Sequence, residues 1–167
     1  ALLVGSPACR AFSQLQTFAQ PVDIEKRNQE LAQGTVHMVL VMQLYEKQLD
    51  CGLLFLHEHG VATSWNLPSA IRVAQRGGVQ IAEGDQCPFG AWSVDKDGPG
   101  LIRKRTGWMS NSVRILSEVA KRCTNESANP GKHHRHVMLV NGRAKAAESY
   151  PPKLVAAVLK ASRDEFD

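Results

Sequence analysis

Short apolar runs alternate with segments of helical periodicity along the first part of the chain. Residues 1–6 and 53–56 are apolar runs bounded by Gly, Ser or charged residues, as in strands buried on both faces. Between them, residues 23–51 carry the apolar spacing of a long helix that begins near Asp23. Gly34 interrupts this spacing and is a position at which the helix can divide in two.

The rest of the chain continues the alternation. Helical spacing recurs at residues 67–75, 112–122 and 151–162, and strand patterns at 79–82, 101–106 and 137–140. Residues 84–100, rich in Gly, Pro and Asp, indicate a loop or irregular hairpin, and residues 125–134 a polar loop. Strands that alternate with helices predict a single α/β domain over residues 1–167, with a mainly parallel sheet.

Two loops follow the first two predicted strands, at residues 5–13 and 57–60. The carboxyl ends of neighbouring parallel strands meet at one edge of a sheet, so we expect Cys9 to lie near Glu58. A cysteine at a helix start can act as a thiolate nucleophile, and a carboxyl group can hydrogen-bond a ring nitrogen of a base. The pair therefore predicts a site for attacking a pyrimidine. For an isolated cysteine and glutamate, a buried small residue and a helix cap are the better explanation.

The residues around this pair carry a family resemblance. Residues 5–13 read Gly-Ser-Pro-Ala-Cys-Arg-Ala-Phe-Ser. This segment resembles the catalytic loop of the cytosine-C5 DNA methyltransferases, Gly-Gly-Pro-Pro-Cys-Gln-Gly-Phe-Ser. Glu58 matches the family's base-binding glutamate in Glu-Asn-Val, and His59 replaces the asparagine. Residues 85–90, 103–111 and 150–154 are similar to phage-type members and to segments of protist mobile-element polyproteins.

The resemblance implies a mechanism and a set of site residues. In the intact family enzyme, the cysteine that corresponds to Cys9 adds to C6 of a flipped-out cytosine. The glutamate that corresponds to Glu58 hydrogen-bonds N3 and the exocyclic amine. The methyl group then passes from S-adenosylmethionine to C5. The resemblance also implies cofactor contacts by Pro7 and Phe12. It implies base or DNA contacts by Ser13, Arg103, Lys104, Arg105, Thr106 and Asn111.

The family's donor-binding elements have no counterpart in residues 1–167. These elements are an upstream strand, a Phe-x-Gly-x-Gly loop and an acidic residue on the next strand. The expected fold is therefore α/β, a partial doubly wound, class I methyltransferase-like Rossmann sheet that lacks its N-terminal donor-binding strands. It comprises a strand and Pro-x-Cys loop at 1–13, a long helix at 23–51, a strand with Glu58 at 53–60, and a C-terminal part at 84–167.

Two expectations follow from this missing half. The chain alone should bind no S-adenosylmethionine and should not methylate DNA. Another subunit, or the missing N-terminal half, should cover the apolar strand edge at residues 1–6.

Composition adds little to this picture. A net charge of +4 and a pI near 9.0 permit DNA as a partner without requiring it. No apolar run approaches the ~18 residues of a membrane span, so no membrane insertion is expected. The cysteines (Cys9, Cys51, Cys87 and Cys123) form no Cys-x-x-Cys pair and no disulfide scaffold. This usage indicates an intracellular protein, nuclear if eukaryotic and otherwise cytoplasmic.

A metal site and two other functions complete the alternatives. Cys123, His133, His134 and His136 fit no zinc-finger spacing, because no second cysteine is near in sequence, and we expect a solvated loop without a metal. The domain is alternatively a non-catalytic module within a larger assembly or a mobile-element polyprotein. A cysteine hydrolase that pairs Cys9 with His57 or His59 is a third possibility without a supporting motif.

Overall fold

The fold is described by a computed structural model that covers residues 1–13, 23–126, 133–140 and 142–166. The chain forms two compact units. Unit 1 comprises residues 1–81 and 107–113, and unit 2 comprises residues 82–106 and 114–167. The middle of the polar loop expected at 125–134 lies outside the described residues.

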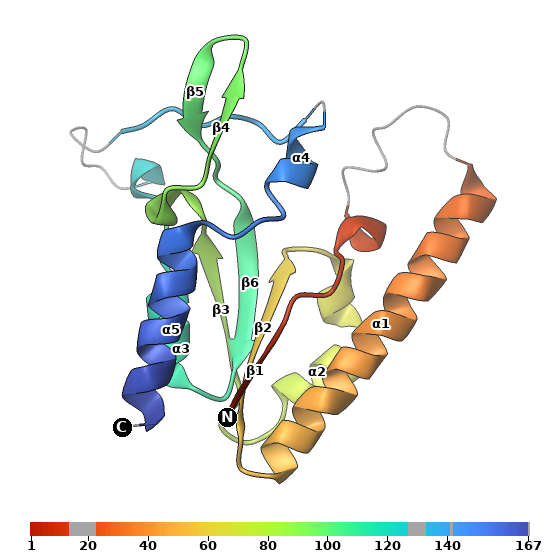
Figure 1. The fold of residues 1–167 in the computed structure, drawn as a ribbon. Helices are drawn as coiled ribbons and strands as arrows, with labels where there is room; N and C mark the ends of the chain where they lie inside the picture. Colours follow the sequence, from red (N-terminus) through yellow and green to blue (C-terminus); the bar gives the residue numbers. More distant parts are fainter. Residues whose placement is uncertain (14–22, 127–132, 141, 167) are drawn as a thin grey trace. The chain divides into compact units, whose positions relative to one another are not determined.

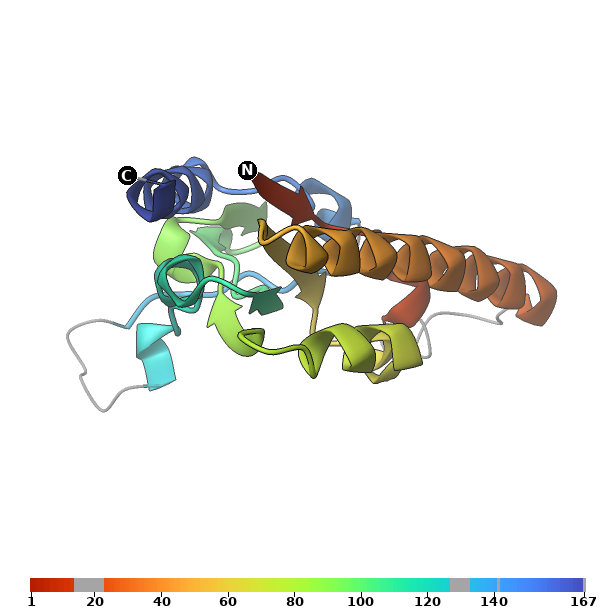
Figure 2. The ribbon, with the colours of Figure 1, turned by 90° about the horizontal axis from the view of Figure 1, so that it is seen from below.

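Unit 1 is built on two parallel strands and two helices. Strand β1 (Leu2–Gly5) pairs with β2 (Leu54–Gly60) in the register that places Gly5 opposite His57. Helix α1 (Ile24–Asp50) runs alongside these strands (Figure 1) and lies beside α2 (Pro68–Ala74) (Figure 2). The core between them consists of the buried residues Phe12, Met38, Val41, Met42, Tyr45, Phe55, Ala70, Val73 and Met109.

Helix α1 is continuous, and Gly34 has a different role from the one the sequence predicts. The Asp23 carboxylate caps the helix by accepting a hydrogen bond from the Lys26 amide at 3.1 Å. A Cβ atom at position 34 would lie 3.1 Å from the Ala11 Cβ and 3.2 Å from a Phe12 ring carbon. The glycine therefore lets the short 3-10 helix η1 (Arg10–Phe12) pack closely on α1, and its backbone cost is offset by that packing.

The strands form a mixed sheet in which β1 is an edge strand. The strand order is β1-β2-β6-β3, where β6 is Arg105–Ser110 and β3 is Gln80–Asp85. The prediction that β1 is buried on both faces is wrong, because Val4 is exposed and Leu2 and Leu3 are only partly buried. The α/β class is confirmed.

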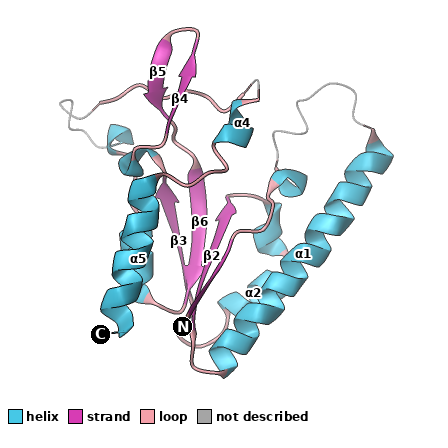
Figure 3. Ribbon diagram, in the orientation of Figure 1, coloured by secondary structure: helices cyan, strands magenta, loops and turns pink. Residues whose placement is uncertain are grey.

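Unit 2 contains a short hairpin and several helical segments. Strands β4 (Trp92–Asp95) and β5 (Gly98–Leu101) pair antiparallel, which confirms the irregular hairpin expected at 84–100 (Figure 3). The helical elements of this unit are η4 (Cys87–Phe89), α3 (Val113–Val119), which begins at the end of unit 1, η5 (Thr124–Glu126), α4 (Arg143–Ala146) and α5 (Pro152–Phe166). Unit 1 also contains η3 (Thr63–Asn66).

Two strand predictions in the second half are wrong. The strand expected at 101–106 lies at 105–110 instead, because Leu101 ends β5 of the hairpin and residues 102–104 connect it to β6. Residues 137–140 form no strand, and an isolated bridge joins Leu101 to His136. Among the described residues, every helix is too short or too polar to cross a lipid bilayer.

Candidate functional site

The carboxyl ends of β1 and β2 bring the two predicted loops together. One residue beyond the Gly5–His57 pair, the Ser6 hydroxyl donates a hydrogen bond of 2.5 Å to Glu58 Oε2. Glu58 is only 3% exposed, so its carboxyl group lies within the protein. Parallel pairing thus places the carboxyl group directly beside the loop that leads to Cys9.

Cys9 lies at the start of η1 and is partly exposed. Its carbonyl oxygen accepts the Phe12 amide hydrogen at 3.1 Å, which closes the turn. The Cys9 Cβ lies 4.0 Å from the position that a Cβ on Gly60 would take. The Cys9 side chain therefore begins beside the end of β2, two residues beyond Glu58, and the predicted proximity of the two loops is confirmed.

A buried polar pair supports the backbone below this site. The Tyr45 hydroxyl lies 3.1 Å from His57 Nδ1, and both side chains are fully buried. The same hydroxyl fills the space beside Gly5, where a Cβ would overlap with it and would lie 3.0 Å from the Tyr45 ring carbon Cζ. Gly5 is therefore required for close packing of β1 against α1.

Replacing Gly5 by Ala should lower the free energy of unfolding by about 2 kcal/mol, because the added methyl group displaces Tyr45. In the double variant Gly5→Ala/Tyr45→Phe, removal of the hydroxyl should relieve part of this cost, although the single Tyr45→Phe change loses a buried hydrogen bond. Urea unfolding of the four proteins gives the coupling energy. If the losses in unfolding free energy of the two single variants add up to that of the double variant, the overlap between a Cβ at position 5 and the Tyr45 hydroxyl is contradicted.

The histidines of β2 are held by neighbouring groups. Burial, and then the nearby His59 ring, lowers the pKa of His57 to about 3. A ring with this pKa is a poor general base at neutral pH, which argues against His57 as the base of a cysteine hydrolase. His59 Nδ1 lies 3.0 Å from the Ser64 hydroxyl, and the Phe12 ring meets the His59 ring edge-on.

Several residues that the resemblance assigned to contacts take part in packing. Phe12 belongs to the core of unit 1, and Pro7 is buried. Ser13 follows η1 and donates its amide to the Arg10 carbonyl at 3.1 Å. Asn111 accepts from the Phe55 amide and donates to the Leu53 carbonyl, so it lies at the start of β2, at the opposite end from Glu58.

The basic segment 103–106 lies in unit 2, where it surrounds a buried carboxylate. Asp85 has a side chain that is 0% exposed, and the guanidinium groups of Arg103, Arg105 and Arg122 lie within 3.5 to 4.0 Å of it. The Lys104 carbonyl accepts the Gln86 amide, and the Thr106 hydroxyl accepts a hydrogen bond from the Gln86 side chain. The structure therefore gives this segment a structural role in unit 2.

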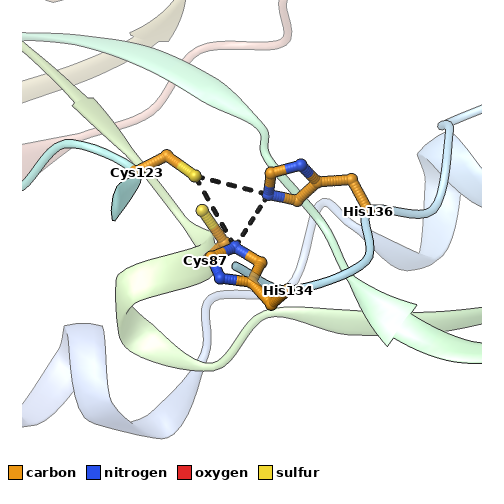
Figure 4. Close-up of side chains that lie close together, drawn as sticks. All are labelled: Cys87, Cys123, His134 and His136. Carbon is orange, nitrogen blue, oxygen red and sulfur yellow. Dashed lines mark hydrogen bonds between the residues drawn. The ribbon is translucent and has the colours of Figure 1, made fainter. Parts of the chain in front are cut away.

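Four further side chains of unit 2 converge on one point: Cys87, Cys123, His134 and His136 (Figure 4). Their sulfur and ring nitrogen atoms all lie within 4.8 Å of one another. The expectation that Cys123 has no cysteine partner is wrong, because Cys87 reaches it from the turn after β3. The expected solvated loop is also wrong here, since both cysteines are buried and both histidines are partly buried.

The surroundings of this cluster disfavour charge on Cys87 and on His136. Burial, followed by the influence of Cys123, raises the pKa of the Cys87 thiol to about 12. Burial and the neighbouring His134 lower the pKa of His136. The sequence signal for this cluster was the His-x-His spacing at 134–136, which places two imidazoles on one face of an extended segment.

No protein-family model, curated protein or solved structure matches the chain.

Proposed function

We propose that unit 1 binds a pyrimidine base and is the catalytic half of a cytosine-C5 DNA methyltransferase-like protein. The observation that carries the proposal is the position of Glu58 near the carboxyl end of β2, beside the loop that follows the adjacent parallel strand β1 and carries Cys9. Strand ends of this kind are where ligands bind in open α/β sheets. The matches of residues 5–13 and Glu58 to the family's motifs support the same conclusion.

In this proposal each residue has a defined role. The Cys9 thiolate forms a bond to C6 of the base, and the electron pair of the C5–C6 double bond moves toward C5. Glu58 donates to N3 in its protonated form and accepts from the exocyclic amine, which stabilises the adduct. Ser6, hydrogen-bonded to Glu58 at 2.5 Å, orients the carboxyl group. Once C5 has acquired the methyl group, a base removes the C5 proton, and its electron pair restores the C5–C6 double bond and releases the thiolate.

The methyl donor in this proposal is S-adenosylmethionine, which supplies the methyl group that C5 acquires. Residues that would bind it are expected outside this chain, on strands that pair with the edge strand β1 and belong to another subunit or to a longer polypeptide. The exposed side chains of Val4 on β1 and of Val36 and Leu40 on α1 support such a covering partner. A nucleophilic thiol also requires a reducing compartment, so we place the protein inside the cell.

The proposal is tested with a probe that needs no methyl donor. A DNA duplex with 2-pyrimidinone in place of the target cytosine accepts a thiolate at C6 without methyl transfer. We expect an adduct that survives denaturing electrophoresis and maps to Cys9 by mass spectrometry. Glu58→Gln should slow its formation about 100-fold, because the mutant carboxamide no longer protonates the ring nitrogen.

Controls separate this outcome from general thiol reactivity. Cys9→Ser should abolish the adduct, and Cys51→Ser, which removes an exposed thiol of the same unit, should leave it unchanged. An adduct on Cys51, or DNA binding without any adduct, would instead indicate a non-catalytic module. With unmodified DNA and S-adenosylmethionine, the isolated chain should transfer no methyl group.

A further inference from the structure

The cluster of Cys87, Cys123, His134 and His136 has the composition and spacing of a metal site. Cys123 Sγ lies 3.5 Å from His136 Nε2 and 3.6 Å from His134 Nε2. A tetrahedral zinc ion with Zn–S of about 2.3 Å and Zn–N of about 2.05 Å separates sulfur and nitrogen ligands by about 3.6 Å. The two observed distances therefore match the edges of a zinc tetrahedron.

We propose that these four side chains bind a structural zinc ion in unit 2. The two Nε2 atoms lie 2.9 Å apart, and zinc would widen this separation to about 3.3 Å, a small rotation of two side chains. Two thiolates and two imidazoles form a donor set that favours zinc over magnesium or calcium, which prefer oxygen ligands. Four protein ligands fill a tetrahedron, which is typical of structural rather than catalytic zinc.

The backbone holds the ligands from three separate segments of unit 2 (Figure 4). Cys87 begins η4, after β3, and the Cys123 amide donates to the buried Asp85 carboxylate at 2.8 Å. Asn125 fixes the third segment, because its side chain both accepts from the His134 amide and donates to the His134 carbonyl. These contacts reduce the conformational freedom that the ligands would lose on binding a metal.

Alternation along the third segment directs both imidazoles to the same point. The Leu101 amide donates to the Arg135 carbonyl, and the Val137 amide donates to the Leu101 carbonyl, so residues 135–137 are extended along the end of β5. Arg135 pairs with Asp95 on the hairpin, while His134 and His136 meet Cys123. Side chains of an extended segment alternate between faces, which explains the His-Arg-His order.

The first test measures the metal on the whole chain. Protein purified under reducing conditions without a metal-affinity column should contain one zinc ion per chain by elemental analysis. Replacing zinc by cobalt should give the visible bands of a tetrahedral ion and a sulfur-to-cobalt charge-transfer band of two thiolates. Zinc should also protect two of the four thiols from a thiol reagent, since Cys87 and Cys123 are ligands.

Matched variants assign the ligands. The variants His134→Asn and Cys123→Ser should each contain no zinc and should melt at least about 10 °C below the wild type. Removal of zinc from the wild type with a chelator should lower its melting temperature by a similar amount. The controls are His133→Asn, which changes the exposed histidine next to His134, and Cys51→Ser, which removes an exposed thiol of unit 1. Both controls should keep one zinc ion and the wild-type melting temperature.

Three results would overturn the proposal. The first is a chain without metal whose melting temperature is unchanged by added zinc or by chelator. The second is zinc retained in full by His134→Asn or Cys123→Ser. The third is a cobalt-substituted chain whose spectrum lacks the sulfur-to-cobalt charge-transfer band. The cobalt spectrum of the wild type decides the question even where a variant fails to fold, and none of these measurements depends on base binding in unit 1.

Discussion

Replacement of Asp85 by Asn should lower the free energy of unfolding by about 3 kcal/mol. Its carboxylate is completely buried and lies within 4.0 Å of three arginine side chains, while it also accepts the Cys123 amide hydrogen. Removing the charge leaves three guanidinium groups without their common partner. The loss should lie at the lower end of the 3–5 kcal/mol range for a broken buried ion pair, because the arginines remain partly exposed.

Glu83 offers a matched control on the same strand. Its carboxylate contacts Arg105 and Arg122, two of the same arginines, but its side chain is 46% exposed. Glu83→Gln should therefore cost less than about 1 kcal/mol. Urea unfolding of the wild type and the two variants at neutral pH measures both changes. Equal losses of unfolding free energy for Asp85→Asn and Glu83→Gln would show that burial of the Asp85 carboxylate does not increase its contribution to stability.

The stability of unit 1 should fall steadily as the pH drops below 6.5. The pKa of His57 is about 3 in the folded protein and about 6.5 in an unfolded chain, so the unfolded state binds the proton between these values. The contribution of neutral His57 is complete above pH 6.5 and is lost progressively toward pH 3. At pH 4.5 the expected loss is about 2–3 kcal/mol, from about 1.4 kcal/mol for each pH unit.

The variant His57→Asn isolates this effect from all other titrating groups. An asparagine side chain can accept a hydrogen bond from Tyr45, as His57 Nδ1 can, but it does not titrate. The difference in unfolding free energy between wild type and variant, measured in urea from pH 7 to pH 4, should change in favour of the variant as the pH falls. A difference that is constant with pH would contradict the low pKa.

The first half of the fold could be predicted because its signals are local. The apolar runs that begin β1 and β2 and the spacing of α1 are each readable from neighbouring residues, and their parallel pairing follows from chain order. That pairing brought Cys9 and Glu58 to adjacent strand ends, as predicted. The start of β6 was predicted four residues too early, because the apolar pair Leu101 and Ile102 follows the hairpin directly and no turn residue separates it from β6.

The His-x-His spacing at 134–136 indicates the two histidines of the cluster in unit 2, but no spacing indicates its two cysteines. Its cysteines are far apart in sequence, and their proximity depends on how η4 and the end of α3 pack around Asp85. The contact of Asn111 with DNA stays a prediction, and no local pattern indicated that its amide also completes the backbone hydrogen bonds of β2. In both cases tertiary contacts, which no local pattern encodes, decide the role of the side chain.

Gly34 has a consequence for the placement of the thiol-bearing loop. At this point α1 presents bare backbone, and Ala11 and Phe12 rest directly against it. The absence of a side chain at position 34 therefore sets the distance between α1 and the loop that carries Cys9. Any larger residue there would lift the loop by a few tenths of an ångström and shift Cys9 relative to Glu58, although position 34 itself is remote from both groups in sequence.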